Sequence, residues 1–193
     1  FTWLMKKRIH QIELFMKYPH DVQLEWFHTL IDSAKNTEWG KLYDYKSILT
    51  VQQYQERIPI QNYDTLKPFI ERMMAGEQNI LWPSDIKWFA KSSGTTSDRS
   101  KFIPVSEESL EECHFKGGKD MLSIYCNNRP DNQMFTGKGL VLGGSHQVCK
   151  LNEDCCYGDL SAVLIKNLPI WAEYYRTPDM SIALMDNYEI KMD

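Results

Sequence analysis

Apolar residues in the first third of the chain recur at the three- and four-residue spacing of amphipathic helices. The apolar positions of a first predicted helix, which ends at Pro19, are Trp3, Leu4, Ile9, Ile12, Phe15 and Met16. Asp21 is then expected to cap a second helix, and Gly40 is expected to end this region. The predicted inner face of the second helix consists of Leu24, Phe27, Leu30, Ile31 and Ala34.

Two shorter helices are predicted next. Thr50 and Gln53 have the spacing of a capping box, which indicates a helix from Val51 to Ile58 that Pro59 stops. A further helix is expected from Asp64 to Ala75, with Gly76 as its C-terminal stop.

From Ile86 onward, short runs rich in β-branched and aromatic residues alternate with helical patterns. Ile86–Ala90 and Lys101–Val105 are predicted strands, and the loop of small polar residues between them makes a hairpin. Ser106 is expected to cap a helix with an acidic start that ends near Cys126 to Pro130. The later predictions are a buried strand over Gly139–Gly143, a helix over Asp159–Leu168 and a final helical stretch over Ser181–Asp193.

This order of elements predicts a mixed α/β fold that belongs to one large domain. Residues 1–80 form its helical segment, and residues 81–193 form a segment of mixed strands and helices. The helical pattern still continues at the last residue, so we expect a truncated chain that holds the N-terminal part of the domain.

Composition narrows the classes of function. The 193 residues carry 22 Lys and Arg against 26 Asp and Glu, and this net charge of −4 argues against a nucleic-acid partner. No apolar run approaches the roughly 18 residues that span a bilayer, so no membrane partner is expected. The five cysteines are irregularly spaced, which favours a reducing cytoplasm over a disulfide framework. Nothing in the sequence indicates an oligomeric state.

The hairpin loop is the segment whose residues suggest chemistry. Between Ser92 and Ser97 every residue is hydroxylic except Gly94, and Arg99 and Lys101 add positive charge at the far end. Hydroxyls and successive backbone N–H groups bind anions, and a glycine lets a phosphate approach the backbone closely. An ordinary hydroxyl-rich turn has a similar composition, but the order Ser-Ser-Gly-Thr-Thr between two strands favours a phosphate site.

The stretch Ser92–Lys101 resembles the phosphate loop of adenylate-forming enzymes. With the preceding Trp88-Phe-Ala and the following Phe-Ile-Pro, it is similar to the auxin-responsive (Gretchen Hagen) family of acyl acid–amido synthetases, in its bacterial branch. The segments Ile58–Asp64 and Gly158–Ala162 also resemble that branch.

The resemblance implies a two-step ligase reaction on a small carboxylic acid and an amino acid. ATP first converts the acid into an acyl-adenylate, and the amine of the amino acid then forms an amide. The implied nucleotide-binding residues are Ser92, Ser93, Gly94, Thr95, Thr96 and Lys101. Mg²⁺ would accompany ATP, held largely by phosphates and water. No catalytic residue and no protein ligand of a metal is implied.

The chain departs from the family pattern in two places. Asp98 stands where the family usually has glycine, and a carboxylate beside a triphosphate is unfavourable unless it turns outward, pairs with Arg99 or reaches Mg²⁺. The downstream family motifs Tyr-x-Ser-Ser-Glu and Tyr-Arg-x-Gly-Asp do not occur. We therefore expect these 193 residues to lack a complete active site.

Other functions stay open on the sequence alone. An acyl-CoA ligase shares the adenylation step but uses a thiol acceptor, and a non-catalytic remnant or binding module would keep the fold without turnover. Four soft metal ligands, His146, Cys149, Cys155 and Cys156, also lie close together. Adjacent cysteines close a tetrahedral zinc site poorly, which favours buried or reduced thiols instead.

Overall fold

The computed structural model describes residues 2–92, 100–141, 148–185, 187, 189 and 190. The chain divides into two compact units. The helical unit contains residues 1–69, 77–85 and 107–132, and the sheet unit contains residues 70–76, 86–106 and 133–193. The mixture of helices and sheets confirms the predicted α/β class.

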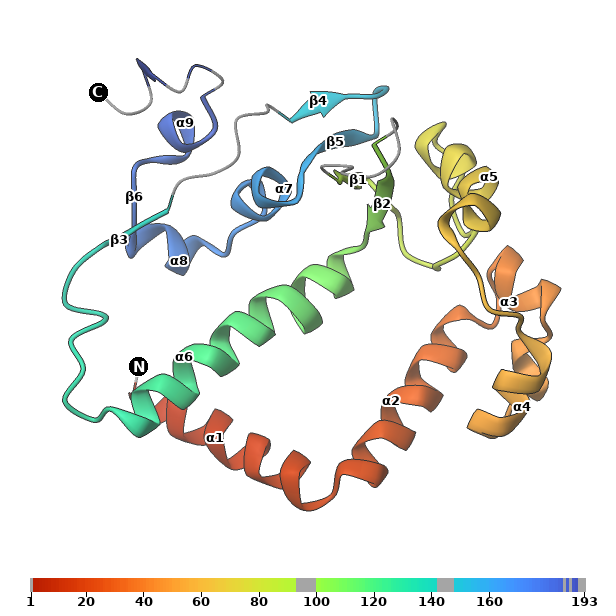
Figure 1. Ribbon diagram of the computed structural model, residues 1–193, viewed down its shortest axis with the longest axis horizontal. Coiled ribbons are helices and arrows are strands. Elements are labelled where there is room, and N and C mark those ends of the chain that lie inside the picture. Colours follow the sequence, from red (N-terminus) through yellow and green to blue (C-terminus); the bar gives the residue numbers. More distant parts are fainter. Residues whose placement is uncertain (1, 93–99, 142–147, 186, 188, 191–193) are drawn as a thin grey trace. The chain divides into compact units, whose positions relative to one another are not determined.

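The helical unit begins with α1 (Thr2–Lys17) and α2 (Pro19–Ala34), followed by the shorter α3 (Glu38–Leu42), η1 (Tyr45–Ser47) and α4 (Val51–Arg57) (Figure 1). It also holds the start of α5 (Tyr63–Met74) and a long helix made of the π-helical segment η2 (Ser109–Phe115) and α6 (Lys116–Asn128). Its core is formed by Ile31, Ala34, Tyr45 and Ile48, with partly buried aromatic rings packed around them. No helix among the described residues has both the length and the apolar character to cross a membrane.

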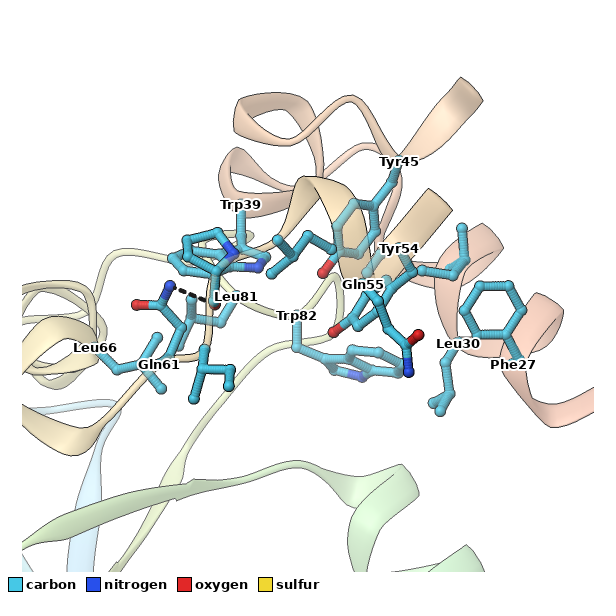
Figure 2. A pocket seen from close by; sticks show the side chains of 15 residues that line it. Phe27, Leu30, Trp39, Tyr45, Tyr54, Gln55, Gln61, Leu66, Leu81 and Trp82 are labelled. Atoms are coloured by element: carbon cyan, nitrogen blue, oxygen red, sulfur yellow. Dashed lines mark hydrogen bonds between the residues drawn. The ribbon is translucent and has the colours of Figure 1, made fainter. Parts of the chain in front are cut away.

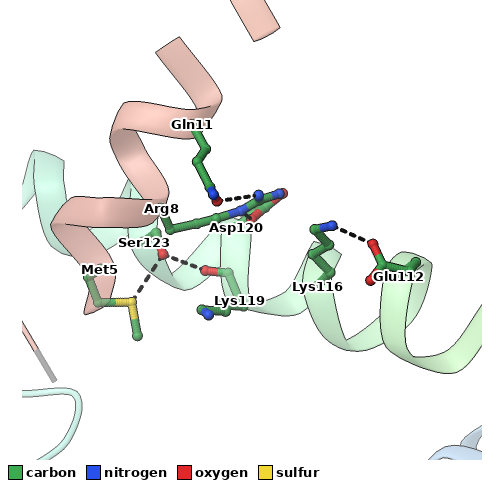
Figure 3. Close-up of polar contacts among 8 residues, drawn as sticks. All are labelled: Met5, Arg8, Gln11, Glu112, Lys116, Lys119, Asp120 and Ser123. Atoms are coloured by element: carbon green, nitrogen blue, oxygen red, sulfur yellow. Dashed lines mark hydrogen bonds and ion pairs between the residues drawn. The ribbon is translucent and has the colours of Figure 1, made fainter. Parts of the chain in front are cut away.

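A buried ion pair joins α1 to α6 in this unit. Arg8 has 6% of its surface exposed, and its Nη2 donates to Asp120 Oδ2 at 2.7 Å while Nε donates to Oδ1 (Figure 3). One turn earlier on α1, the sulfur of Met5 accepts a hydrogen bond at 3.0 Å from the buried hydroxyl of Ser123. These contacts align two helices that lie more than 100 residues apart in the sequence.

The sheet unit contains a four-stranded sheet in the order β2-β1-β5-β4. These strands are β1 (Trp88–Lys91), β2 (Phe102–Val105), β4 (Cys149–Lys150) and β5 (Cys156–Asp159). The pairs β1–β2 and β4–β5 are antiparallel, whereas β1 and β5 run parallel. Helix α7 (Leu160–Lys166) packs on β1 and β5 and buries Ala162, Val163 and Ile165.

The rest of the sheet unit is built from short elements. Strands β3 (Gly139–Leu140) and β6 (Arg176–Thr177) form a parallel pair, α8 (Ile170–Tyr174) precedes β6, and α9 (Met180–Ala183) follows it. Arg176 is buried, and its Nη2 and Nε donate to the two carboxylate oxygens of Glu173 at 2.6 and 2.7 Å.

Several helix boundaries confirm the local predictions. The capping box exists, because Thr50 Oγ1 accepts from the Gln53 N–H at 3.2 Å and Gln53 Oε1 accepts from the Thr50 N–H at 3.2 Å. Helix α4 ends at Arg57, just before Pro59. Gly76 has a φ of +104° directly after α5, which is the left-handed conformation that glycine adopts readily at a helix end.

The start of α2 and the role of Gly40 differ from the predictions. Helix α2 begins at Pro19, whose fixed φ suits the first helical position, so Asp21 lies in the first turn and is not the cap. Leu24 and Leu30 were expected on the inner face, yet both are exposed. Gly40 does not end the region but lies inside α3, where its N–H donates to the Thr37 side chain at 2.9 Å.

Two predictions in the second half of the chain differ from the structure. Of the buried strand expected over Gly139–Gly143, the described part is a strand only at Gly139–Leu140, both of which are exposed, while residues 142 and 143 lie outside the described residues. The helix expected over Ser181–Asp193 is interrupted, because α9 ends at Ala183 with that residue buried, Met185 and Asn187 are not helical, and the described residues are helical again at 189 and 190. A short helix depends on packing for its stability, and an apolar pattern without a core to face does not extend it.

Candidate functional site

The predicted phosphate loop begins and ends at two paired backbones of the sheet unit. Strands β1 and β2 pair with Lys91 opposite Phe102, which confirms the expected hairpin. One residue further on, the Ser92 N–H donates to the Lys101 carbonyl at 2.9 Å, and the Lys101 N–H donates to Ser92 Oγ at 3.2 Å. The two ends of the loop are therefore held together by a side chain as well as by the ladder.

The candidate residues divide into those the structure describes and those it does not. Ser92 is partly buried, and Lys101 is exposed. The other predicted nucleotide-binding residues, Ser93, Gly94, Thr95 and Thr96, lie outside the described residues. The charged loop residues Asp98 and Arg99 also lie outside them. The nucleotide-binding role of all six predicted residues stays a prediction.

The loop leaves the sheet at an edge where two parallel strands end. In the register of β1 and β5, Lys91 lies opposite Asp159, so both strands reach their carboxyl ends at the same level. In α/β sheets, ligands bind outside the carboxyl ends of parallel strands. The position of the loop is therefore typical of a ligand site.

Asp159 is a residue of this edge to which the sequence assigned no role. It is the last residue of β5 and directly precedes α7. The signal was present in the similarity of Gly158–Ala162 to the family, but that similarity did not show which strand would lie beside the loop. The parallel pairing with β1 supplies this information.

Two aromatic rings pack beside β1, close to the base of the loop. The rings of Phe102 and Tyr157 meet edge to face, with centroids 5.4 Å apart. A hydrogen bond with the Cys149 thiol raises the pKa of the Tyr157 phenol, so this side chain stays neutral near pH 7. The pair thus links β2 and β5, the two strands that flank β1.

The cysteines of the zinc alternative are not gathered around a common point within the described part of the chain. Cys155 is fully buried, and its Sγ lies 3.9 Å from the Met73 carbonyl and 3.8 Å from the Ile86 carbonyl. Burial raises the pKa of this thiol, which keeps it protonated and unreactive. No cluster of three potential metal ligands occurs among the described residues, and His146 lies outside them.

The arrangement favours the binding of an anion. Lys101 contributes an exposed ammonium at one end of the loop, next to the carboxyl ends of β1 and β5. An ammonium is a compact charge that suits phosphate oxygens. Asp159 places a carboxylate at the same edge, opposite Lys91 in the register of β1 and β5.

Comparison with known proteins identifies relatives of the chain. A family model described as the GH3 family N-terminal domain matches residues 8–193. The chain is 28% identical over 176 residues to indole-3-acetic acid-amido synthetase GH3.4 of Arabidopsis thaliana, which covers 90% of this chain and 28% of the relative. It is 28% identical over 107 residues to jasmonoyl--L-amino acid synthetase JAR6 of Nicotiana attenuata, which covers 55% of this chain and 18% of the relative.

Solved structures resemble the fold over nearly the whole chain. A structure of AtGH3.15 acyl acid amido synthetase in complex with 2,4-DB superposes with a TM-score of 0.81 at 16% identity, covering 97% of this chain and 32% of that chain. A second structure, of GH3.15 acyl acid amido synthetase, gives a TM-score of 0.73 at 15% identity and covers 89% and 30% of the two chains. The chain thus spans less than a third of the length of these relatives.

Proposed function

Because this chain belongs to the GH3 family, we propose that the whole protein is an ATP-dependent acyl acid–amido synthetase and that this chain carries its phosphate-binding loop. The observation that supports the loop assignment best is the pairing of Ser92 with Lys101 at the carboxyl edge of β1 and β5. The family model matches residues 8–193, so support for the proposed reaction comes from nearly the whole chain and not from the loop alone.

The proposed reaction has two balanced steps. A carboxylate oxygen of the acyl acid forms a bond to the α-phosphorus of ATP, and the bond from that phosphorus to the bridging oxygen breaks, so pyrophosphate leaves. The amine nitrogen of an amino acid then forms a bond to the acyl carbon, the carbon–oxygen bond of the adenylate breaks, and AMP and a proton are released. Both steps depend mainly on positioning and on charge neutralisation.

The proposed roles follow from residue type and place. Lys101 offsets negative charge on the departing pyrophosphate, and Ser93, Thr95 and Thr96 donate hydroxyl or backbone N–H groups to phosphate oxygens. Gly94 allows the close approach of a phosphate to the backbone. ATP and Mg²⁺ are therefore proposed ligands of the whole protein, with Mg²⁺ held chiefly by phosphates and water.

We further propose that a complete active site requires residues beyond these, because the two downstream family motifs do not occur in this sequence. The assignment to the bacterial branch and a cytoplasmic location remain predictions from the sequence.

Calorimetric titration of this chain with Mg-ATP tests the loop. We expect saturable binding that Lys101→Ala weakens about tenfold or more, since hydrogen bonds to charged groups contribute about 1.5–3 kcal/mol. Lys87→Ala is the matched control, because Lys87 is an exposed lysine just before β1, at the opposite end of that strand from the loop. Its affinity should equal that of the wild type.

Titration of the Asp98→Gly variant with Mg-ATP tests whether Asp98 prevents phosphate binding by the loop. If the folded wild-type chain does not bind but Asp98→Gly does, Asp98 has disabled a phosphate site, and the non-catalytic alternative is favoured. If neither variant binds, the loop needs the further residues of a complete active site, and the same titration of the whole protein decides, since no binding there would refute the loop assignment. In the whole protein, pyrophosphate release that depends on an amino acid supports the synthetase, whereas release that depends on coenzyme A supports the ligase alternative.

A further inference from the structure

The helical unit contains a pocket of about 1020 Å³, and all of its described lining residues belong to that unit (Figure 2). Its walls come from α2, α3, η1, α4, α5 and the segments 58–61 and 81–82. Five aromatic side chains define its character: Phe27, Trp39, Tyr45, Tyr54 and Trp82. We call this space the aromatic pocket.

The rings in the aromatic pocket are arranged edge to face and not in a stack. Tyr54 meets Phe27 at a centroid distance of 5.9 Å and an interplanar angle of 88°, and it meets Tyr45 at 6.1 Å and 60°. Edge-to-face walls offer both ring edges and ring faces to a guest, which suits a flat aromatic molecule. The volume is in the range of small-molecule sites.

Among the described residues that line the aromatic pocket, none has a charged side chain. Arg57 on α4 is the nearby candidate for a counter-charge, but its Nη1 donates to the Asp44 carbonyl at 2.8 Å and to Ser47 Oγ at 2.6 Å and does not line the space. A buried ion without a partner is strongly disfavoured. The pocket therefore selects an uncharged guest, which separates it from any site for ATP or for a carboxylate.

Trp82 supplies the polar feature of this wall. Among the described residues, its Nε1 is the one buried side-chain nitrogen or oxygen that lacks a hydrogen-bond partner. A buried donor that is left without a partner destabilises the structure, so a ligand that accepts its hydrogen bond is favoured. The Gln55 amide and the Tyr54 hydroxyl lie near the Trp82 ring in Figure 2, so this side of the pocket holds polar groups besides the indole N–H.

The rim of the aromatic pocket is apolar and exposed. Ile60 is fully exposed, and Leu30 has 49% of its surface exposed, although both line the space. Apolar side chains held open to water at the mouth of an aromatic cavity are covered favourably by an apolar guest. The exposed side chains of Leu30 and Ile60 therefore mark the mouth through which a ligand would enter.

We propose that the aromatic pocket binds an uncharged, flat aromatic small molecule that carries a hydrogen-bond acceptor, and that Trp82 Nε1–H donates to this acceptor. This donor is buried, so a rotation of the partly buried Trp82 ring accompanies binding. None of the described lining residues belongs to the segment Ser92–Lys101, so the proposal does not rest on the phosphate-loop assignment.

Quinoline and naphthalene make a matched pair of probes. The two molecules have nearly the same shape, but only quinoline has a ring nitrogen that accepts a hydrogen bond, and 2-naphthoate adds a negative charge. With ¹⁵N-labelled chain at neutral pH, we expect quinoline to shift the indole N–H resonance of Trp82. That resonance is identified among those of the six tryptophans as the one absent in Trp82→Phe.

The affinities should follow the order quinoline, naphthalene, 2-naphthoate. Quinoline should bind about three- to tenfold more tightly than naphthalene, the range that one net hydrogen bond produces. Trp82→Phe should remove this difference by lowering the quinoline affinity alone. Trp26→Phe is the matched control, because Trp26 is an exposed tryptophan of α2 that does not line the pocket, and it should change neither affinity.

A second variant keeps the test decisive if Trp82→Phe does not fold. Ile60 is fully exposed, so Ile60→Glu leaves the core intact while it places a charge at the rim, and it should weaken both neutral probes. The proposal is overturned if the Trp82 resonance does not respond to saturating quinoline, if Ile60→Glu has no effect, or if 2-naphthoate binds most tightly. Equal affinities of the wild type for quinoline and naphthalene would refute the role of the indole donor.

Discussion

Arg8 on α1 and Asp120 on α6 form a two-bond ion pair inside the helical unit, although 112 residues separate them in the sequence. The side chain of Arg8 is nearly buried, with 7% exposed, whereas that of Asp120 is 28% exposed. Gln11 Oε1 accepts a further hydrogen bond from Arg8 Nη1 at 2.9 Å. The carboxylate raises the pKa of Arg8, so the guanidinium stays charged at any pH of interest.

Removal of the Asp120 carboxylate should destabilise the helical unit strongly. Asp120→Ala leaves the buried Arg8 charge without its partner, and breaking such a pair costs about 3–5 kcal/mol. Glu112→Ala removes the exposed ion pair with Lys116 on the same long helix, which is worth about 0.3–0.5 kcal/mol (Figure 3). Urea denaturation of both variants measures the difference, and equal losses would contradict a structural role for the buried pair.

Two glycines in helices should respond to alanine in opposite directions. A Cβ on Gly40 would lie 2.1 Å from the Ala34 carbonyl oxygen, so Gly40→Ala forces backbone to move and should cost at least about 1–3 kcal/mol. A Cβ on Gly117 in α6 meets nothing within 4 Å, so Gly117→Ala should stabilise by up to about 1 kcal/mol. Thermal unfolding followed by circular dichroism separates the two. A Gly40→Ala protein as stable as the wild type would refute the close approach.

The Ser92 hydroxyl should affect ATP binding by positioning the loop. Its Oγ accepts the Lys101 N–H, so Ser92→Ala loosens the base of the loop and should weaken Mg-ATP binding about three- to tenfold, the range of one hydrogen bond. Ser92→Thr keeps the hydroxyl and should restore most of the affinity in the same titration. An unchanged affinity in Ser92→Ala would show that the backbone hydrogen bonds between β1 and β2 hold the ends of the loop without the Ser92 hydroxyl.

The Glu173–Arg176 pair should make the sheet unit sensitive to acid. The hydrogen bonds from Arg176 hold the pKa of Glu173 below its ordinary value, so the unfolded chain takes up the proton first as the pH falls. The stabilisation is therefore complete above the ordinary glutamate pKa of about 4.3 and is lost as the pH falls through the lower folded value.

Glu173→Gln should remove that part of the acid sensitivity. Urea midpoints measured from neutral pH into this acid range should fall less steeply for Glu173→Gln than for the wild type. Glu153→Gln, at an exposed glutamate of the same unit, should follow the wild-type curve. Parallel curves for all three proteins would mean that the pair contributes nothing to folding.

Local chemistry explains which predictions the structure confirms. The capping box at Thr50 and Gln53 and the glycine stop at Gly76 act within four residues, so the sequence alone carries the whole signal. The hairpin of β1 and β2 belongs to the same class, because its two strands lie close together in the sequence. The composition of the loop and its likeness to the family likewise needed no coordinates.

Long-range contacts explain the failures. Leu30 fits the apolar face of α2 by spacing, but it lies at the rim of the aromatic pocket, which only the packing of α4 and the segment 81–82 against α2 creates. The sequence predicts a helix stop at Gly40, but Thr37 caps a new helix, α3, and accepts the hydrogen bond of the Gly40 N–H. The apolar run at Gly139 has a single described strand beside it, and this exposes a segment that the pattern alone assigns to a core.

The amino-acid sequence by itself determined the mixed class of the fold, the capping box at Thr50, the glycine stop at Gly76, the hairpin and the family, because each depends on residue type and short spacing. Only the tertiary structure decided that β5 runs parallel beside β1 with Asp159 at the edge of the loop, that Arg8 pairs with Asp120, and that an uncharged pocket surrounds Trp82. These features join residues tens to more than a hundred positions apart. No periodicity encodes such partners, since the pairing is selected by burial and hydrogen bonding over the whole of each unit.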